Sequence, residues 1–197
     1  ITTLKLLNNT FPDINLRQTY GMIELGVLRA KTRSQDSLWV KMGGEGYKLR
    51  VRNGVLEIKA DSAMLGYINA ESPFTDDGYL ITGDLVEQDG EWLRILGRQS
   101  DIINVGGQKV YPAEVEAVIL DHTDVKDATV YGARHALTGK IVCADILLQD
   151  DIDEQEARKS ILSLCNTRLQ KYMVPMKLRF VNEALQGYRL KRVRVQK

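Results

Sequence analysis

The chain has little of the residue chemistry on which metal sites and catalytic triads depend. Its 197 residues include only two cysteines and two histidines. Cys143 and Cys165 lie in apolar surroundings with no CxxC spacing, so we interpret them as reduced core residues rather than as ligands or nucleophiles. His122 and His135 are too far apart for an i, i+4 metal pair. These absences argue against metal and triad chemistry, and a reducing, cytoplasmic compartment is the expected location.

The chain also lacks a charge excess and a long apolar run. With 27 Lys and Arg against 26 Asp and Glu, no bulk electrostatic argument supports a nucleic-acid or anionic-membrane partner. No run approaches the roughly 18 apolar residues that a transmembrane segment needs, and the N-terminus has no signal-peptide pattern. Since 44% of the residues are hydrophobic and 27% are charged, the composition is that of a folded globular protein whose function depends on local sites.

Residues 39–96 are rich in turn signals between short β-favouring runs. Asn53-Gly54 separates KLRVR from VLEIKA, and Asp89-Gly90 separates LVEQ from EWLRIL. An Asn-Gly or Asp-Gly pair between such runs is typical of a β-hairpin. We therefore expect a small antiparallel β subdomain in the first half of the chain.

Helix and strand patterns alternate after Gly97. Pro112 stands at the first turn of a predicted helix, and Asp153 opens a second, amphipathic one. Strand-like runs DATVYGAR, KIVCADILLQ and KLRFV accompany these helices. The pattern predicts an α+β fold, in which a β subdomain within residues 1–97 is followed by a domain of residues 98–197 with helices packed on a small sheet.

Four local patterns combine reactive side chains with turns. An acceptor-only carboxylate at a Thr-Gly-Asp turn, for example, is suited to holding paired hydroxyl groups. A basic C-terminal segment is either a solvated tail or a cationic arm that meets a phosphate or carboxylate. The four patterns are Tyr20–Glu24 (YGMIE), Gly78–Asp84 (GYLITGD), Gly97–Glu116 and, in the basic segment, Tyr188–Lys191 followed by Arg194.

In this order and at these distances, the patterns resemble the AMP-forming adenylating enzymes: acyl-CoA synthetases, aryl-CoA ligases, luciferases and peptide-synthetase adenylation domains. Gly97–Glu116 is similar to the hinge motif of that superfamily, and Arg168–Pro175 is similar to the segment that follows it. The resemblance extends from about Phe11 to Arg194. It implies that the first domain is the end of the large AMP-binding domain and that the second is the C-terminal lid.

The resemblance implies a nucleotide site in the first domain. Tyr20 would stack on adenine beside Gly21, and Glu24 would hold Mg²⁺ against the phosphates of ATP. Asp84 would accept the ribose hydroxyls of ATP or AMP, and Arg98 would support the ribose and the neighbouring phosphate. A positioned cation and Mg²⁺ are the expected stabilisers of the charge that develops on the phosphate oxygens.

In the second domain the resemblance implies residues that serve two half-reactions. Ser100 occupies the hinge position, and Gly106 and Gly107 resemble the loop that admits a pantetheine arm. Lys191 aligns with the lid lysine that supports attack of the carboxylate on the α-phosphorus. Glycine leaves room for the pantetheine chain, and lysine carries a compact charge that a mobile lid can deliver and withdraw.

Three positions depart from the family pattern. Ile23 stands where the family usually has a threonine hydroxyl, Leu190 where it usually has glycine, and Ser100 where aspartate or lysine is common. The family's Gly-rich phosphate loop, ending in Pro-Lys, does not occur in these 197 residues. We therefore expect the chain to be a C-terminal fragment that does not turn over ATP by itself.

These observations predict part of an ATP-dependent, AMP-forming ligase. The full-length enzyme would activate a carboxylic acid as its acyl-adenylate and transfer the acyl group to coenzyme A. One alternative is transfer to the phosphopantetheine of an acyl carrier protein. Another, motivated by Ile23 and Leu190, is a non-catalytic, nucleotide-binding relative.

Overall fold

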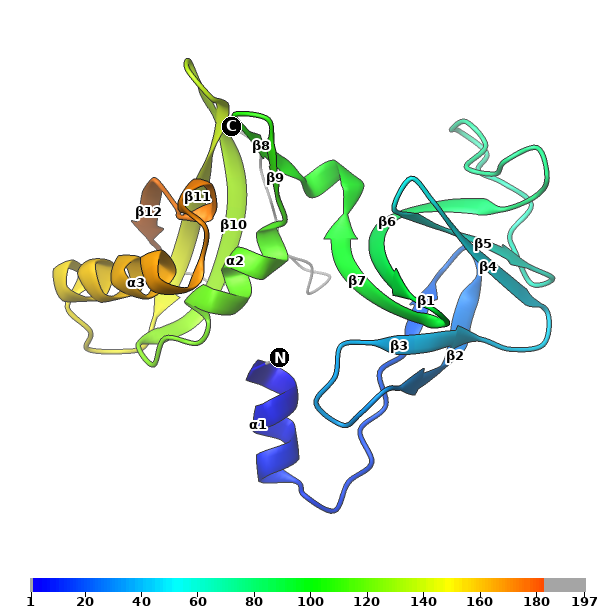
Figure 1. Cartoon of the computed structure of the whole chain (residues 1–197), viewed down its shortest axis with the longest axis horizontal. Helices are drawn as coiled ribbons and strands as arrows, with labels where there is room; N and C mark the ends of the chain where they lie inside the picture. Colours follow the sequence, from blue (N-terminus) through cyan, green and yellow to red (C-terminus); the bar gives the residue numbers. More distant parts are fainter. Residues whose placement is uncertain (1, 183–197) are drawn as a thin grey trace. The chain divides into compact units, whose positions relative to one another are not determined.

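The computed structural model describes residues 2–182, with side chains from residue 4 onward. The chain divides into two compact units, Thr3–Gln99 and Ser100–Lys197. The first unit consists mainly of strands, and the second packs helices on a sheet, so the predicted α+β fold class is confirmed (Figure 1). The division falls two residues after the expected one between residues 97 and 98.

Unit 1, residues 3–99, is built on a seven-stranded sheet in which every neighbouring pair is antiparallel. The strand order is β1-β2-β3-β7-β6-β5-β4, so pairing between β3 and β7 joins the first three strands to the last four. Its elements are α1 (Thr2–Thr10), β1 (Tyr20–Met22), β2 (Gly26–Thr32), β3 (Val40–Gly43), β4 (Tyr47–Arg52), β5 (Val55–Ala60), β6 (Leu80–Asp89) and β7 (Trp92–Arg98).

Both predicted hairpins are present. Asn53 and Gly54 connect β4 to β5 with φ angles of 53° and 79°. A two-residue turn with two positive φ angles matches the twist of the flanking strands, which explains the Asn-Gly pair. The second turn lies one residue later than predicted, at Gly90 and Glu91, because Asp89 is already paired with Trp92 in the β6–β7 ladder.

Strand β5 lies inside the sheet and is buried on both faces. Leu56 and Ile58 are fully buried, and the Glu57 side chain between them is also buried. A buried carboxylate needs a charged partner, and Arg50 supplies one, with 2.5 Å between its Nε and Glu57 Oε2. Arg52 Nε lies 3.6 Å from the other carboxylate oxygen. The core of unit 1 thus contains an ion-pair network beside its apolar cluster.

Unit 2 has a five-stranded sheet with β11 at its centre in the described residues up to 182. Strand β11 pairs antiparallel with β10 and β8, and parallel with β12. The parallel pair follows from the helical crossover of α3, which returns the chain in the same direction. The elements are η1 (Gln99–Asp101), which spans the division, β8 (Ile103–Val105), β9 (Gln108–Val110), α2 (Pro112–Ile119), β10 (Val125–His135), β11 (Gly139–Leu148), α3 (Glu154–Arg168), η2 (Lys171–Met173) and β12 (Lys177–Phe180).

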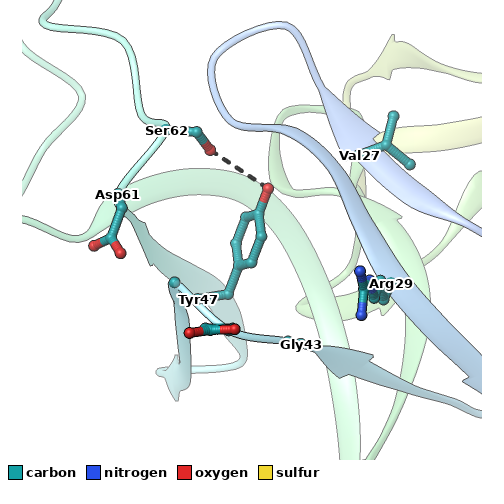
Figure 2. Close-up of a pocket in the computed structure, with 9 residues that line it drawn as sticks. Val27, Arg29, Gly43, Tyr47, Asp61 and Ser62 are labelled. Atoms are coloured by element: carbon teal, nitrogen blue, oxygen red, sulfur yellow. Dashed lines mark hydrogen bonds between the residues drawn. The ribbon is translucent and has the colours of Figure 1, made fainter.

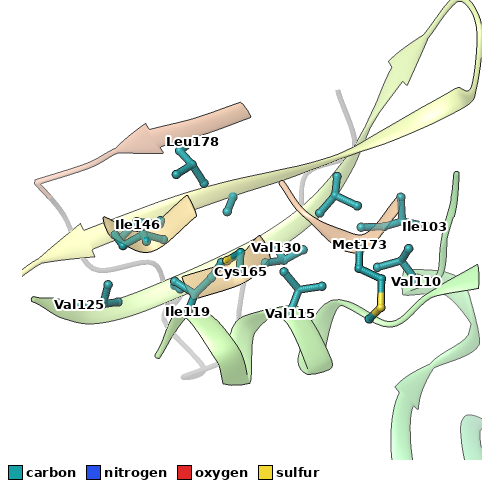
Figure 3. Close-up of a cluster of buried hydrophobic side chains, with 14 of the residues drawn as sticks. Ile103, Val110, Val115, Ile119, Val125, Val130, Ile146, Cys165, Met173 and Leu178 are labelled. Atoms are coloured by element: carbon teal, nitrogen blue, oxygen red, sulfur yellow. The ribbon is translucent and has the colours of Figure 1, made fainter. Parts of the chain in front are cut away.

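Helices α2 and α3 contribute to one apolar core against the sheet (Figure 3). Alternate strand residues such as Val130 and Ile146 face Val115 and Ile161 of the helices, and all four are fully buried. Asp153 caps α3, since its carboxylate accepts the first free backbone N–H groups of the helix. No helix within residues 2–182 has the length and apolar character to cross a membrane.

The prediction that the two cysteines are reduced core residues is confirmed. Cys143 and Cys165 are both buried and unbridged. Burial raises the pKa of the Cys165 thiol to about 11, and burial also raises the pKa of Cys143. Both therefore remain protonated near neutral pH, where a nucleophile or ligand would have to be a thiolate.

Candidate functional site

Three residues singled out from the sequence come together in unit 1, although they lie far apart along the chain. The Tyr20 phenol donates a hydrogen bond to Asp84 Oδ2 over 2.5 Å. Arg98 Nε lies 2.9 Å from Asp84 Oδ1. We call Tyr20, Asp84 and Arg98 the carboxylate cluster. Asp84 is directly opposite Arg98 in the β6–β7 ladder, which explains why the cation and the carboxylate meet.

The backbone around Asp84 is fixed by a buried threonine. Thr82 Oγ1 donates to the carbonyl of Leu56 over 2.7 Å and accepts from the Asp84 N–H over 3.0 Å. Arg98 Nη1 donates to the Thr82 carbonyl over 2.7 Å. The predicted turn at Thr-Gly-Asp is not formed, because the motif lies within strand β6. Gly83 has a φ of 72° there, a conformation that a side chain would strain. The Thr-Gly-Asp motif therefore sets the position of the carboxylate.

The electrostatics of the cluster suit the binding of hydroxyl groups. Burial, followed by the hydrogen bond to Asp84, raises the pKa of Tyr20, so this phenol stays neutral and acts as a donor. A carboxylate has about four acceptor positions, and Tyr20 and Arg98 each take one of those on Asp84. Its two oxygens can therefore accept from further hydroxyls while Arg98 balances the charge.

Strands β1 and β2 approach each other closely at Gly21, which lies opposite Val27 in their ladder. A Cβ added at Gly21 would lie 2.8 Å from the carbonyl oxygen of Gly26 and 3.0 Å from the Cα of Val27. Both are backbone atoms, so no side chain fits at this position. Ile23, by contrast, is fully exposed. Gly21 therefore permits the close pairing of β1 and β2, and Ile23 presents an apolar surface where a hydroxyl was expected from the resemblance.

Glu24 has a partner that the sequence did not reveal. Tyr67, 43 residues later, donates a hydrogen bond from its phenol to Glu24 Oε1 over 2.6 Å. The hydrogen bond to Glu24 is the first cause of a raised Tyr67 pKa, and the charge of Arg98 acts in the opposite direction. No local spacing signals the contact between Tyr67 and Glu24, because it joins two loops that only the folded chain brings together.

The residues predicted for the second half-reaction lie at the start of unit 2. Ser100 is its first residue, and the Ser100 hydroxyl donates to Asp101 over 3.0 Å. Gly106 and Gly107 form the β8–β9 turn with φ angles of 55° and 86°. A Cβ at either glycine would meet no atom within 4 Å of the described residues, so the turn is open. Gly106 N donates to the carbonyl of Thr138 over 3.0 Å, which anchors the turn to the β10–β11 hairpin.

Lys191 and Leu190 lie outside the described residues.

A separate pocket of unit 1, of about 490 Å³, contains none of the predicted site residues (Figure 2). It adjoins the Glu24 loop, since Tyr47 and Ser62 on its wall both donate to the carbonyl of Leu25. Its lining residues are Val27, Arg29, Gly43, Gly44, Glu45, Gly46, Tyr47, Asp61 and Ser62.

Comparison with known proteins gives the family context of this fold. Residues 114–190 match the family described as AMP-binding enzyme C-terminal domain. The 2-succinylbenzoate–CoA ligases of Bacillus cereus and Geobacillus kaustophilus are each 34% identical over 86% of this chain. The chain spans 38% of the length of each of these relatives.

Solved structures are similar over both units. The o-succinylbenzoate CoA synthetase of Bacillus subtilis, in complex with its acyl-adenylate intermediate, has a TM-score of 0.69 and 30% identity over 78% of this chain and 34% of its own. MatB from Rhodopseudomonas palustris, with bound ATP, has a TM-score of 0.69 and 29% identity over 86% of this chain and 37% of its own. Fold and matches together define the class of adenylating enzymes. Residues 114–190 belong to the C-terminal domain family of AMP-binding enzymes, and the chain as a whole is similar to part of the AMP-forming adenylating enzymes.

Proposed function

We propose that this chain is the ribose-binding and lid portion of an AMP-forming acid–CoA ligase. The complete protein converts a carboxylic acid and ATP into an acyl-adenylate and pyrophosphate, and then transfers the acyl group to the thiol of coenzyme A with release of AMP. The observation that carries the proposal is the carboxylate cluster in a chain whose relatives are CoA ligases.

The carboxylate cluster takes the nucleoside end of ATP. Asp84 accepts the two ribose hydroxyls, and Arg98 holds Asp84 and supports the ribose and the nearby phosphate. Tyr20 provides the aromatic face for adenine beside Gly21, where β1 and β2 approach each other closely. The support is geometric: a nearly buried carboxylate is held between a cation and a neutral phenol, and charge-assisted hydrogen bonds of this kind are strong and directional.

Glu24 suits the Mg²⁺ that accompanies ATP. Within residues 2–182 no group of three or more His, Cys, Asp or Glu side chains could hold a metal by itself. Mg²⁺ usually takes one or two protein carboxylates and completes its octahedron with waters and substrate phosphates. A single carboxylate, four residues after Tyr20 of the carboxylate cluster, therefore fits this ion. When bound, the ion would stabilise charge on the phosphate oxygens. Glu24 would hold it there.

The second unit serves the change between half-reactions. We assign unit 2, from Ser100 onward, to the lid, with Ser100 as its hinge. Gly106 and Gly107 give the pantetheine arm of coenzyme A an unobstructed turn to pass, which agrees with the open space around both. Lys191 supplies the cation that stabilises attack on the α-phosphorus.

The test uses the complete protein that carries this chain. It is incubated with Mg²⁺, ATP, coenzyme A and 2-succinylbenzoate, the acid named for the curated relatives, and then with other aromatic and aliphatic acids. Formation of AMP and of an acyl-CoA thioester in equal amounts is the expected result. If AMP forms but the acyl group is transferred only to the phosphopantetheine of a carrier protein, the assignment of coenzyme A as the acceptor would be wrong. ATP binding without AMP formation from any acid would overturn the enzyme assignment in favour of a nucleotide-binding relative.

A further inference from the structure

We infer that Tyr67 is a positioning residue for the adenylation half-reaction, which acts by holding the Glu24 carboxylate in a fixed orientation toward the metal–nucleotide. This inference rests on the proposed function, since it gives Glu24 the Mg²⁺-binding role. It adds a residue that no motif in the sequence selects, from a segment of unit 1 between β5 and β6.

The segment holds the Glu24 loop at three points. Ser62 Oγ donates to the Leu25 carbonyl over 3.0 Å. The backbone N–H of Met64 donates to the Glu24 carbonyl over 2.8 Å. The Tyr67 phenol donates to the Glu24 carboxylate over 2.6 Å. We call residues 62–67 the clamp, because its bonds reach both the backbone and the side chain of the same carboxylate residue.

Tyr67 is exposed, but less so than its apolar neighbours in the segment. Leu65 and Ile68 have relative exposures of 105% and 99%, whereas that of Tyr67 is 47%. Apolar packing therefore does not hold this end of the clamp. The hydrogen bond to Glu24 is the contact that gives Tyr67 its direction, and the same bond restricts the rotation of the glutamate side chain.

The bond leaves the chemistry of Glu24 intact. A neutral phenol neither removes the negative charge of the carboxylate nor occupies its second oxygen, because Tyr67 contacts Oε1. Mg²⁺ demands a nearly ideal octahedral arrangement of oxygens, so the orientation of a carboxylate ligand matters. Groups that orient a metal ligand typically change metal affinity by roughly 10- to 100-fold when they are removed.

The decisive variant is Tyr67→Phe in the complete protein, measured by binding rather than by turnover. The affinity for α,β-methylene-ATP is determined by calorimetry over a series of Mg²⁺ concentrations. We expect Tyr67→Phe to raise the Mg²⁺ concentration needed for half-maximal binding by about 10-fold or more. The affinity for AMP without metal should stay unchanged, and so should thioester formation from a supplied acyl-adenylate.

Two controls separate positioning from general damage. Tyr47→Phe also removes a phenol that bonds to the Glu24 loop, but at the Leu25 carbonyl, and should leave the Mg²⁺ dependence as in the wild type. In a Glu24→Gln background, Tyr67→Phe should have no further effect, since its action passes through the carboxylate.

An unchanged Mg²⁺ dependence in Tyr67→Phe would overturn the inference. So would an equal loss of metal-free AMP binding, or a full Tyr67→Phe effect in the Glu24→Gln background. A failure of the proposed function is distinguishable, because the wild-type protein would then bind α,β-methylene-ATP without any response to Mg²⁺, or not bind it at all.

Discussion

Asp84 is nearly buried, yet its carboxylate can accept further hydrogen bonds. Both properties determine how much it should contribute to the free energy of ligand binding. It is only 8% exposed, yet its two partners leave both oxygens able to accept further bonds. Hydrogen bonds to a charged group contribute about 1.5–3 kcal/mol each. A ligand with paired hydroxyls at Asp84 should therefore depend strongly on the negative charge at this position.

The substitution Asp84→Asn tests this dependence. It keeps the size of the side chain but removes its charge, so the affinity of the complete protein for AMP should fall by roughly 10- to 100-fold. Calorimetric titration with AMP measures the change. Asp89→Asn is the matched control, because Asp89 lies on the same strand with an exposed ion pair to Arg33. Equal affinity in the Asp84 variant and the control would contradict the assignment of the ribose site.

The two thiols should be inert in the native protein. Burial raises the pKa of both, to about 11 for Cys165, so little thiolate is present at about pH 8, where thiol reagents react. We expect no reaction of the native chain with 5,5′-dithiobis(2-nitrobenzoate) and reaction of two thiols per chain after unfolding in guanidinium. Absorbance of the released thiolate measures both, and rapid labelling before unfolding would contradict the burial of Cys143 or Cys165.

At the scale of elements, local chemistry predicted most of the secondary structure. Asn53-Gly54 specified a hairpin because only residues tolerant of positive φ fit its turn. Pro112 and Asp153 marked the starts of α2 and α3 because each suits the unbonded N–H groups of a first turn. The order of the strands could not be read in this way, because the β3–β7 and β11–β12 pairings depend on packing between distant segments.

The residues of the candidate site also differ in whether local sequence could predict them. Asp84 and Arg98 were found because each stands in a recognisable motif, and their opposition in the β6–β7 ladder follows from a hairpin that the sequence also predicted. Tyr67 was missed because its only link to Glu24 is a side-chain contact across 43 residues. A phenol in a turn-rich segment has no spacing that distinguishes it from a surface residue.

Arg50 connects three elements of unit 1 and makes its stability depend on pH. Its guanidinium bonds to Glu57 on β5 and to Asp77 in the turn before β6. The bond from Arg50 to Asp77, followed by one from Thr75, holds the pKa of Asp77 well below its usual range. An acid whose pKa is lower in the folded state stabilises the fold above its unfolded pKa, which is about 3.9, and loses that contribution as the pH falls further.

Asp77→Asn should therefore lower the free energy of unfolding at neutral pH. The difference in that free energy between the variant and the wild type should narrow as the pH falls below about 4. The midpoint of urea unfolding, measured in a pH series, reports this change. Asp36→Asn is a suitable control because Asp36 is exposed and accepts a local bond from Ser34. A difference between Asp77→Asn and the wild type that stays constant with pH would mean that the carboxylate charge is not the source of its contribution.

At the scale of the whole molecule, each unit has an apolar core of its own. The cluster around Leu56 and Ile58 belongs to unit 1, and the cluster around Val130 and Ile161 belongs to unit 2. The division between the units falls inside η1, between Gln99 and Ser100. Two separately packed bodies joined at one point of the chain are the arrangement that a rotation about a hinge requires.

Ser100→Pro tests this rotation in the complete protein. Proline fixes φ near −65° and disfavours the helical conformation of the preceding residue, so it restricts the backbone where η1 passes from one unit to the other. If the two half-reactions need different hinge conformations, the restriction should slow one of them by about tenfold or more relative to the other, which is roughly 1.4 kcal/mol of barrier. Pyrophosphate exchange measures adenylation, and thioester formation from a supplied acyl-adenylate measures transfer. Ser100→Ala, which keeps the backbone free, should affect neither rate, and an equal loss of both rates in Ser100→Pro would argue against a hinge at this residue.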